Sequence, residues 1–222
     1  MNSIAITARL YNGFVSADRY SPAIDGILGY WIMRERLGPE QFNITQGHSY
    51  QMQAVEGLPL QCIDHGEWWW YACSAPIYSA AANVRKHIHR RFDQHHAERY
   101  LPDGARKVQT SAGAYKNARI SLMHHITDRV TWHVVGDQPE IERLLDNCTA
   151  IGGKVAAGFG RVKSWEYAQG DDLIATLYRP LPVEYAQQNG VSGPRMRWGI
   201  RPPVRLASNQ ADCIMPQFSE DD

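Results

Sequence analysis

The sequence predicts an α+β fold, because strand-like and helix-like stretches alternate in an order that builds one two-layer core. Residues 3–10 alternate between apolar and other side chains, as a half-buried strand does. Residues 22–37 carry apolar side chains at helical spacing, with Ser21 as the expected N-cap. A stretch rich in glycine and basic residues, 147–165, leads from a second helix into a last strand.

The middle of this core is predicted from residues 120–147. Residues 120–126 and 130–134 alternate and are joined by three polar residues, which predicts a hairpin. A short amphipathic helix follows over 139–147, and a strand over 158–167 closes the unit. The resulting βαββαβ order is that of the ferredoxin-like (RRM-type) fold.

Two long segments lie outside that core. Residues 38–117 form an insertion between the first helix and the hairpin, and residues 169–222 form a partly irregular C-terminal extension of the domain at 1–168. An alternative assigns residues 68–78, which include three adjacent tryptophans, as the second core strand. Those tryptophans are expected either to stack on a ligand or to cover a small core of the insertion.

Charge is segregated along a chain whose net charge is zero. Residues 85–163 carry 14 Lys and Arg against 8 Asp and Glu, whereas 1–84 carry 4 against 7 and 164–222 carry 5 against 8. This distribution predicts one basic face, as polyanion-binding proteins have. The four cysteines have no regular spacing, and no apolar run is long enough to span a membrane, so a reducing, cytoplasmic location is expected.

The glycine-rich stretch is a candidate phosphate cradle. Glycines permit positive φ and let a ligand approach the backbone, while neighbouring cations neutralise its charge. The alternative, without a ligand, is a flexible turn between the helix and the strand. It is favoured by the order of the elements, because known nucleotide-binding motifs place such a loop after a strand rather than after a helix. The candidate residues are Gly152, Gly153, Lys154, Gly158, Gly160, Arg161 and Lys163.

A second basic segment begins at Arg85 and runs through Lys107 with seven Lys and Arg and four histidines. Such a segment is usually a solvated surface, but guanidinium groups also pair with phosphates in a bidentate manner. It includes a predicted turn at 102–104. The candidate contacts of this arm are Arg85, Lys86, Arg90, Arg91 and Lys116.

The C-terminal extension offers fewer signals. Residues 173–177 are expected to add one strand, and residues 219–222 to be disordered. Residues 193–205 contain four arginines and no acid, and their prolines disfavour regular structure. That segment is interpreted as a second RNA contact, a subunit contact or a strap across the domain.

No cofactor or metal is expected. Cys62, His65 and Cys73 lack the paired spacing of a zinc site. A metal-independent ribonuclease is the catalytic alternative, since it needs a base near the 2′-hydroxyl and a cation for the developing charge. His124 and His125, with Lys116 and Tyr115, are the residues that could supply those groups.

Three motifs in order resemble the RAMP superfamily, the RNA-binding proteins of CRISPR ribonucleoproteins. Ile151-Gly-Gly-Lys followed by Gly158-Phe-Gly-Arg-Val looks like the C-terminal glycine-rich loop of that superfamily. Pro22 to Tyr30 resembles its first helix, and Thr127 to Asp137 resembles the strand that leads into its second helix. The resemblance covers residues 1 to about 168.

In its length and in the position of its glycine-rich loop, the chain is most similar to the guide-RNA handle-binding (Cas5-like) subunit of a type IV CRISPR effector complex. The resemblance implies a non-catalytic antiviral-defence protein that holds the 5′ handle of the guide RNA (crRNA) and caps the backbone assembly. Its implied partners are the guide RNA and other subunits, with target DNA as a further candidate. The arm is similar to the thumb of such subunits, and it is expected to hold the RNA together with the glycine loop, from opposite sides. Processing of guide-RNA precursors by an endoribonuclease remains the alternative.

Overall fold

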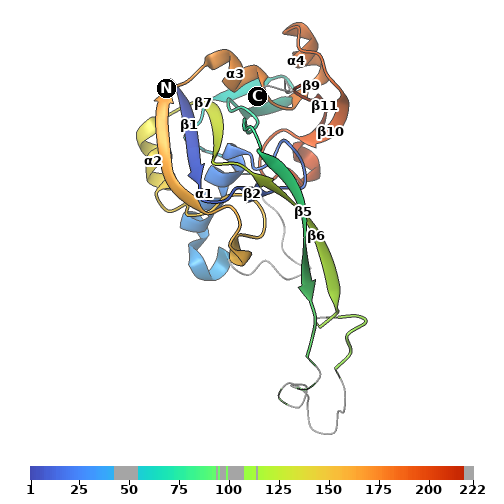
Figure 1. Ribbon diagram of the computed structural model, residues 1–222. Coiled ribbons are helices and arrows are strands. Elements are labelled where there is room, and N and C mark those ends of the chain that lie inside the picture. Colours follow the sequence, from blue (N-terminus) through green and yellow to red (C-terminus); the bar gives the residue numbers. More distant parts are fainter. Residues whose placement is uncertain (43–54, 94, 96–98, 100–107, 114, 218–222) are drawn as a thin grey trace.

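The computed structural model describes residues 1–42, 55–93, 95, 99, 108–113 and 115–217, without the side chains of 39–42. The described chain forms a mixed α/β body from which one long hairpin projects (Figure 1). The predicted turn at 102–104 and the predicted disorder at 219–222 lie outside the described residues. No helix within the described ranges is long and apolar enough to cross a membrane.

A three-stranded antiparallel sheet forms the centre of the body. Its strands are β1 (Asn2–Leu10), β7 (Arg129–Gly136) and β8 (Val162–Gln169), in the order β7-β1-β8. β1 is central because it pairs with β7 on one side and with β8 on the other. Every second residue from Ile4 to Leu10 is buried, as the alternation in the sequence predicts.

Two helices cover one face of this sheet, α1 (Ile24–Phe42) and α2 (Gln138–Leu145). Ser21 does not cap α1 as expected, because its hydroxyl instead donates to the Asp18 carboxylate at 3.2 Å. The predicted end of the first helix is visible at Gly38, whose φ of 74° and ψ of 159° break the regular helix. The two helices and three strands share one core. Its largest fully buried side chains include Ile4, Ile6, Ile24, Leu28, Trp132, Ile141, Leu144 and Leu145.

The expected hairpin between 120–126 and 130–134 is wrong. β6 (Ala118–Ile126) pairs with β5 (Ala82–Arg90) and with the short β2 (Phe14–Val15), whereas β7 pairs with β1. The other edge of β7 receives isolated bridges from Leu60, Cys73 and Ile77. Two of these bridges come from residues 68–78, the segment that the alternative assignment placed in the core sheet. The regular strand of that segment, β4 (Trp68–Tyr71), does not join the core sheet but pairs with β3 (Cys62–His65).

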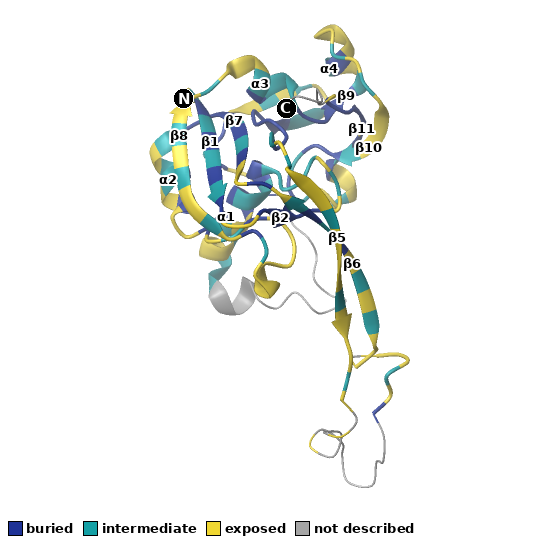
Figure 2. Ribbon diagram, viewed as in Figure 1, coloured by how far each residue is buried: buried dark blue, intermediate teal, exposed yellow. Residues whose placement is uncertain are grey.

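β5 and β6 form the projecting arm. Their nine residue pairs run from Ala82 opposite Ile126 to Arg90 opposite Ala118. β5 is mostly exposed and β6 is mostly half-buried or buried, and the buried residues of the hairpin lie at the end near the body (Figure 2). The first part of the basic segment, residues 85–90, thus lies on a hairpin that projects from the core.

The C-terminal residues form a second compact unit. β9 (Leu181–Pro182), β10 (Arg195–Gly199) and β11 (Gln210–Ile214) build a sheet in the order β10-β11-β9. Residues 173–177, expected to be a strand, belong to helix α3 (Asp172–Leu177), because the Asp171 carboxylate accepts from the Leu173 and Ile174 N–H groups. Helix α4 (Val183–Gln188) and the 3-10 turns η2 (Val155–Ala157) and η3 (Ala207–Asn209) complete the described elements.

The C-terminal sheet shares its core with the insertion. The Trp70 side chain is fully buried against residues that include Leu181, Ile200 and Met215. Trp69 is covered by the Arg201 guanidinium, which lies 4.1 Å from its ring centroid. The tryptophans therefore build a core, and β10 lies within the arginine segment that was expected to be irregular.

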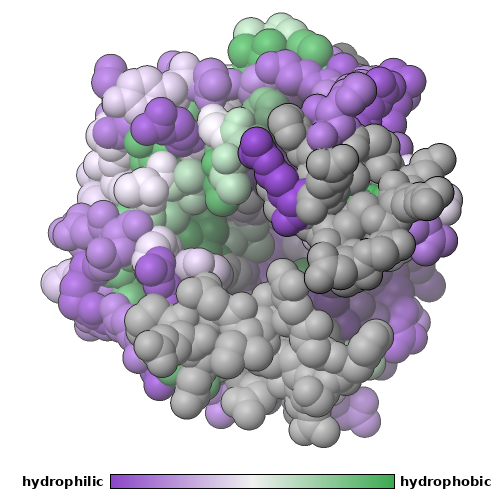
Figure 3. Space-filling model, turned by 90° about the horizontal axis from the view of Figure 1, so that it is seen from below, coloured by the Kyte–Doolittle hydropathy of each residue, from purple (hydrophilic) through white to green (hydrophobic). Residues whose placement is uncertain are grey.

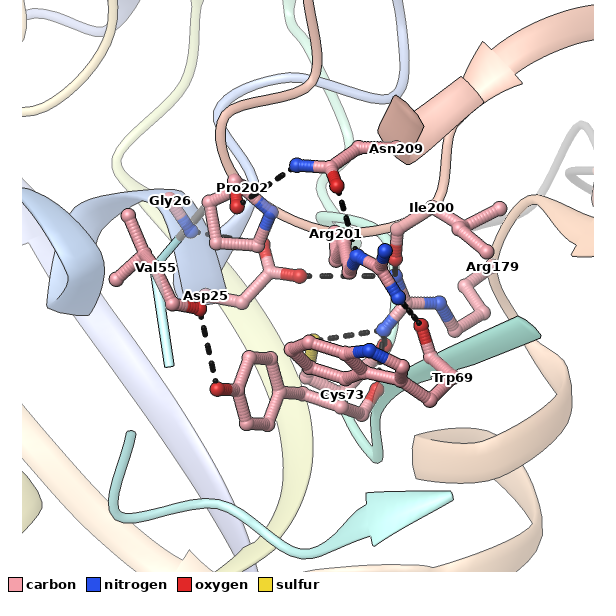
Figure 4. Close-up of polar contacts among 11 residues, drawn as sticks. Asp25, Gly26, Val55, Trp69, Cys73, Arg179, Ile200, Arg201, Pro202 and Asn209 are labelled. Carbon is pink, nitrogen blue, oxygen red and sulfur yellow. Dashed lines mark hydrogen bonds and ion pairs between the residues drawn. The ribbon is translucent and has the colours of Figure 1, made fainter. Parts of the chain in front are cut away.

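A buried ion pair connects α1 to this C-terminal unit (Figure 4). Arg179 lies 3.6 Å from the Asp25 carboxylate, and their side chains are only 6% and 3% exposed. The same guanidinium donates to the Tyr71, Cys73 and Ile200 carbonyls. Burial raises the pKa of the adjacent Cys73 thiol to about 12, so this cysteine is neutral and unreactive at physiological pH.

Candidate nucleic-acid interface

The glycine-rich stretch forms a tight loop between α2 and β8. Its conformation uses left-handed φ angles at Lys154 (58°), Gly158 (87°) and Gly160 (72°). Backbone hydrogen bonds attach it to β2 and to the turn before β2. The Gly153 N–H donates to the Val15 carbonyl at 2.7 Å, and the Gly160 N–H donates to the Gly13 carbonyl at 3.1 Å. Within the loop, the Gly158 N–H donates to the Val155 carbonyl at 2.9 Å. Three of the N–H groups predicted to contact phosphate are therefore already engaged within the protein.

The four glycines of the loop differ in their surroundings. A Cβ atom on Gly160 would lie 1.8 Å from the Ile151 carbonyl oxygen, and one on Gly152 would lie 2.7 Å from the Val15 oxygen. On Gly153 it would be 3.4 Å from the same oxygen, whereas on Gly158 it would meet nothing within 4 Å. Gly152 and Gly160 are thus required for packing, whereas Gly158 leaves open space beside its Cα, where a ligand could approach the loop closely.

Three exposed cations surround the loop, Lys154, Arg161 and Lys163. Within the described residues, none of them has an ion-pair partner within 4.0 Å. By contrast, Arg9 pairs with Glu166 and Asp128, and Arg143 pairs with Glu35 and Glu140. The loop therefore carries positive charge that other residues do not neutralise.

The base of the arm lies directly against this loop. The Lys86 ammonium sits 5.3 Å from the centroid of the Phe159 ring, and the His124 ring meets the same phenyl edge-on at 5.1 Å. The structure thus brings one predicted arm residue together with the predicted loop residues. The contact through Phe159 was not foreseen, because no sequence signal pairs residues 73 positions apart.

Successive side chains of a strand point to opposite faces, so the cations of β5 and β6 are divided between the two faces of the arm. Lys86 and Arg90 share a face with His124, and so project on the side of the glycine loop. Arg85 lies on the other face, with His87 and His89. The same face includes Arg119, opposite His89, which the sequence analysis missed because the arm was defined without its return strand.

The outer end of the arm is separated from the loop. Arg91 and Lys116 lie beyond the last strand pair and are exposed, and the Arg90 Nε donates to the Lys116 carbonyl at 3.0 Å. Seen from below, hydrophilic residues border part of a hydrophobic hollow (Figure 3). A long anionic ligand is required to contact both the loop and the outer arm.

The residues proposed for cleavage are not assembled. Tyr115 and Lys116 precede Ala118, which is six residues and therefore about 20 Å along the strand from His124. His124 is 3% exposed, and its Nε2 lies 2.7 Å from the Asn12 carbonyl, so this nitrogen carries the hydrogen. Burial lowers the pKa of His124 below its ordinary value and keeps the ring neutral.

His125 also has a structural environment. Its Nδ1 lies 2.6 Å from the Asn83 side-chain oxygen, and its ring packs near those of Phe14 and Tyr78. Burial lowers its pKa as well. The described residues include no group of three or more His, Cys, Asp or Glu arranged to hold a metal ion.

An α/β body with an unneutralised cationic loop and a basic arm is the type of structure that binds polyanions. The family model of CRISPR type IV associated protein Csf3 matches residues 2–212. The chain belongs to this family, which is Cas5-like and consistent with the RAMP resemblance. A search among curated proteins returned no match.

Proposed function

We propose that this chain is a non-catalytic, RNA-binding subunit of a type IV CRISPR ribonucleoprotein, in which it holds the 5′ handle of the guide RNA. The observation that carries the proposal is the contact between the glycine loop and the arm base. Because Phe159 touches both Lys86 and His124, cations from two distant parts of the chain form one surface. A single strand crossing it would meet phosphate contacts in succession.

The proposed phosphate contacts are the cations of the loop and of the arm, with the open space beside Gly158 allowing close approach. The residues are Lys86, Arg90, Arg91, Lys116, Gly152, Gly153, Lys154, Gly158, Gly160, Arg161 and Lys163, with Arg85 as a weaker contact because it lies on the other face of the arm. Among the glycines, Gly158 leaves room for the RNA and the other three hold the loop in shape. Family membership supports other complex subunits as partners, and we extend this proposal to contact with target DNA.

The fold supports the RAMP assignment over residues 1–168. β8, β1 and β7, with α1 and α2 on one face, correspond to three strands and both helices of a ferredoxin-like core. We propose that the fourth strand position, beside β7, has been taken over by the segment that includes Cys73 and Ile77. Residues 169–222 are then an extension that completes the body.

The test is RNA binding measured over a range of salt concentrations. Lys154→Ala/Arg161→Ala should weaken binding of handle RNA and reduce the salt slope by about 1.4, or about 0.7 for each phosphate that is no longer neutralised. Arg195→Ala/Arg197→Ala removes the same charge from exposed positions on β10 and serves as the matched control. Equally weakened binding in the two variants would show that only overall charge matters, and would overturn the proposal. Site-specific cleavage of repeat RNA by the parent would contradict the non-catalytic assignment.

A further inference from the structure

Tyr11 presents a large aromatic ring to solvent beside the glycine loop. Its residue is 68% exposed, although it directly follows the buried Leu10 at the end of β1. Its backbone is nevertheless fixed, because the Tyr11 N–H donates to the Arg161 carbonyl at 3.1 Å. The preceding Leu10 N–H donates to the Asp128 carbonyl at 2.7 Å. Because the backbone is fixed, only the two side-chain torsions of the ring have to be ordered when it binds a ligand.

The strand register brings this ring next to a proposed phosphate contact. Leu10 pairs with Val162 at the end of the β1–β8 ladder, and the Tyr11 N–H donates to the Arg161 carbonyl one residue beyond this pair. This hydrogen bond places Tyr11 and Arg161 side by side where the glycine loop leads into β8. Both residues are exposed, whereas Leu10 is buried in the core.

The other aromatic ring of this surface is already engaged. Phe159 is only partly exposed and is in contact with Lys86 and His124. Within the described residues, Tyr11 has neither a ring contact nor a side-chain hydrogen bond. Its ring is therefore available to a ligand and contributes nothing to the core.

We propose that Tyr11 is a stacking site for one unpaired base of the bound RNA, whose adjoining phosphate is held by Arg161. The inference rests on the proposed function. It adds a contact to a base of the RNA, whereas the other proposed contacts are to its phosphates. Stacking on an aromatic ring is tolerant of base identity, because every base has a π-face. Tyr11 would thus position the strand without reading its sequence.

Substitutions at Tyr11 separate stacking from other roles. Tyr11→Ala should weaken binding of handle RNA about 5- to 100-fold, the usual range for removal of one stacked base. Tyr11→Phe and Tyr11→Trp should bind nearly as the parent does. The salt slope should stay unchanged in Tyr11→Ala but fall in Arg161→Ala. Tyr30→Ala, on the helix that covers the opposite face of the sheet, is the matched control and should bind normally.

Abasic scanning of the RNA supplies the decisive comparison. If one base stacks on Tyr11, removal of that base from the RNA should weaken binding to the parent protein. The same abasic RNA should bind Tyr11→Ala as tightly as the intact RNA does. Two results would overturn the stacking site but not the proposed function. In the first, Tyr11→Ala binds handle RNA as tightly as the parent. In the second, Tyr11→Ala weakens binding equally whichever nucleotide of the RNA is abasic. If the parent itself shows no affinity for handle RNA, the proposed function fails as well.

Discussion

At the scale of single residues, the glycine loop depends on two different properties of glycine. Gly160 has a positive φ and almost no room for a Cβ atom, because the Ile151 carbonyl lies against it. Gly158 has a positive φ but open space around it. The first glycine is needed to fold the loop, and we expect the second to be needed for close approach of the RNA backbone.

This difference predicts that Gly158→Leu folds but binds RNA poorly. The positive φ should cost about 1–2 kcal/mol of stability, and the side chain should fill the open space beside the loop. Affinity for handle RNA should fall on the order of tenfold, or about 1.4 kcal/mol, because the RNA would be held away from the neighbouring cations. Unfolding in urea and fluorescence anisotropy with labelled RNA would measure the two effects.

Gly190→Leu is the matched control, because Gly190 also combines a positive φ of 69° with open space. It should lose similar stability and keep full RNA affinity. Equal RNA binding by both variants would show that the backbone at Gly158 does not contact the ligand.

At the scale of elements, the arm is a two-stranded ribbon whose faces carry different cations. Lys86 and Arg90 project on the side of the glycine loop, whereas Arg85 and Arg119 project on the other. A strand of RNA running from the loop along the arm would meet the first pair. The ribbon gains little stability from its own packing, because most of its residues are exposed.

We therefore predict a face-dependent effect of charge removal. Lys86→Ala/Arg90→Ala should weaken RNA binding and reduce the salt slope by about 1.4. Arg85→Ala/Arg119→Ala removes two charges from the same hairpin and should have a clearly smaller effect. Salt-dependent binding isotherms of the two variants decide the matter. A larger effect for the second variant would mean that the RNA follows the outer face instead.

At the scale of the whole molecule, the C-terminal extension is built into the body. Arg179 pairs with Asp25 at the start of α1, and Trp70 from the insertion packs into the C-terminal core. Among the three interpretations of the arginine segment, a strap receives support from Arg201, which stacks on Trp69 and bonds to Asn209 at 2.8 Å. The extension thus stabilises the domain that carries the RNA-binding surface.

Breaking the central ion pair should therefore destabilise the entire protein. Arg179→Leu leaves the Asp25 carboxylate buried without its partner and should cost about 3–5 kcal/mol in the free energy of unfolding. Asp25→Leu/Arg179→Leu should cost less than the single substitution, because no uncompensated charge remains.

Arg143→Ala is the surface control, since the Arg143 side chain is 49% exposed and its ion pairs are screened by solvent, so its removal should cost much less stability than Arg179→Leu. Urea denaturation of the three variants measures all these differences. A decrease below about 1 kcal/mol in Arg179→Leu would contradict a central role for the pair.

The sequence by itself determined the elements whose patterns are local. The alternation in β1, the apolar faces of α1 and α2 and the glycine-rich loop were all predicted near their observed positions, because side-chain periodicity records which face is buried. The basic segment was recognised from composition, but its hairpin with β6 was not. The boundaries shifted most at β8, which starts at Val162 rather than 158, because the glycine turns postpone regular pairing.

Only the tertiary structure decided which strands pair and which cations meet. Alternation identifies 120–126 as a strand but cannot show that its partner is β5 rather than β7, since pairing depends on contacts between residues far apart in sequence. The contact of Lys86 with Phe159 and the exposure of Tyr11 depend on the same long-range packing. The burial of Arg179 was equally hidden, because a lone arginine in a polar tail gives no sign of the carboxylate that it meets after folding.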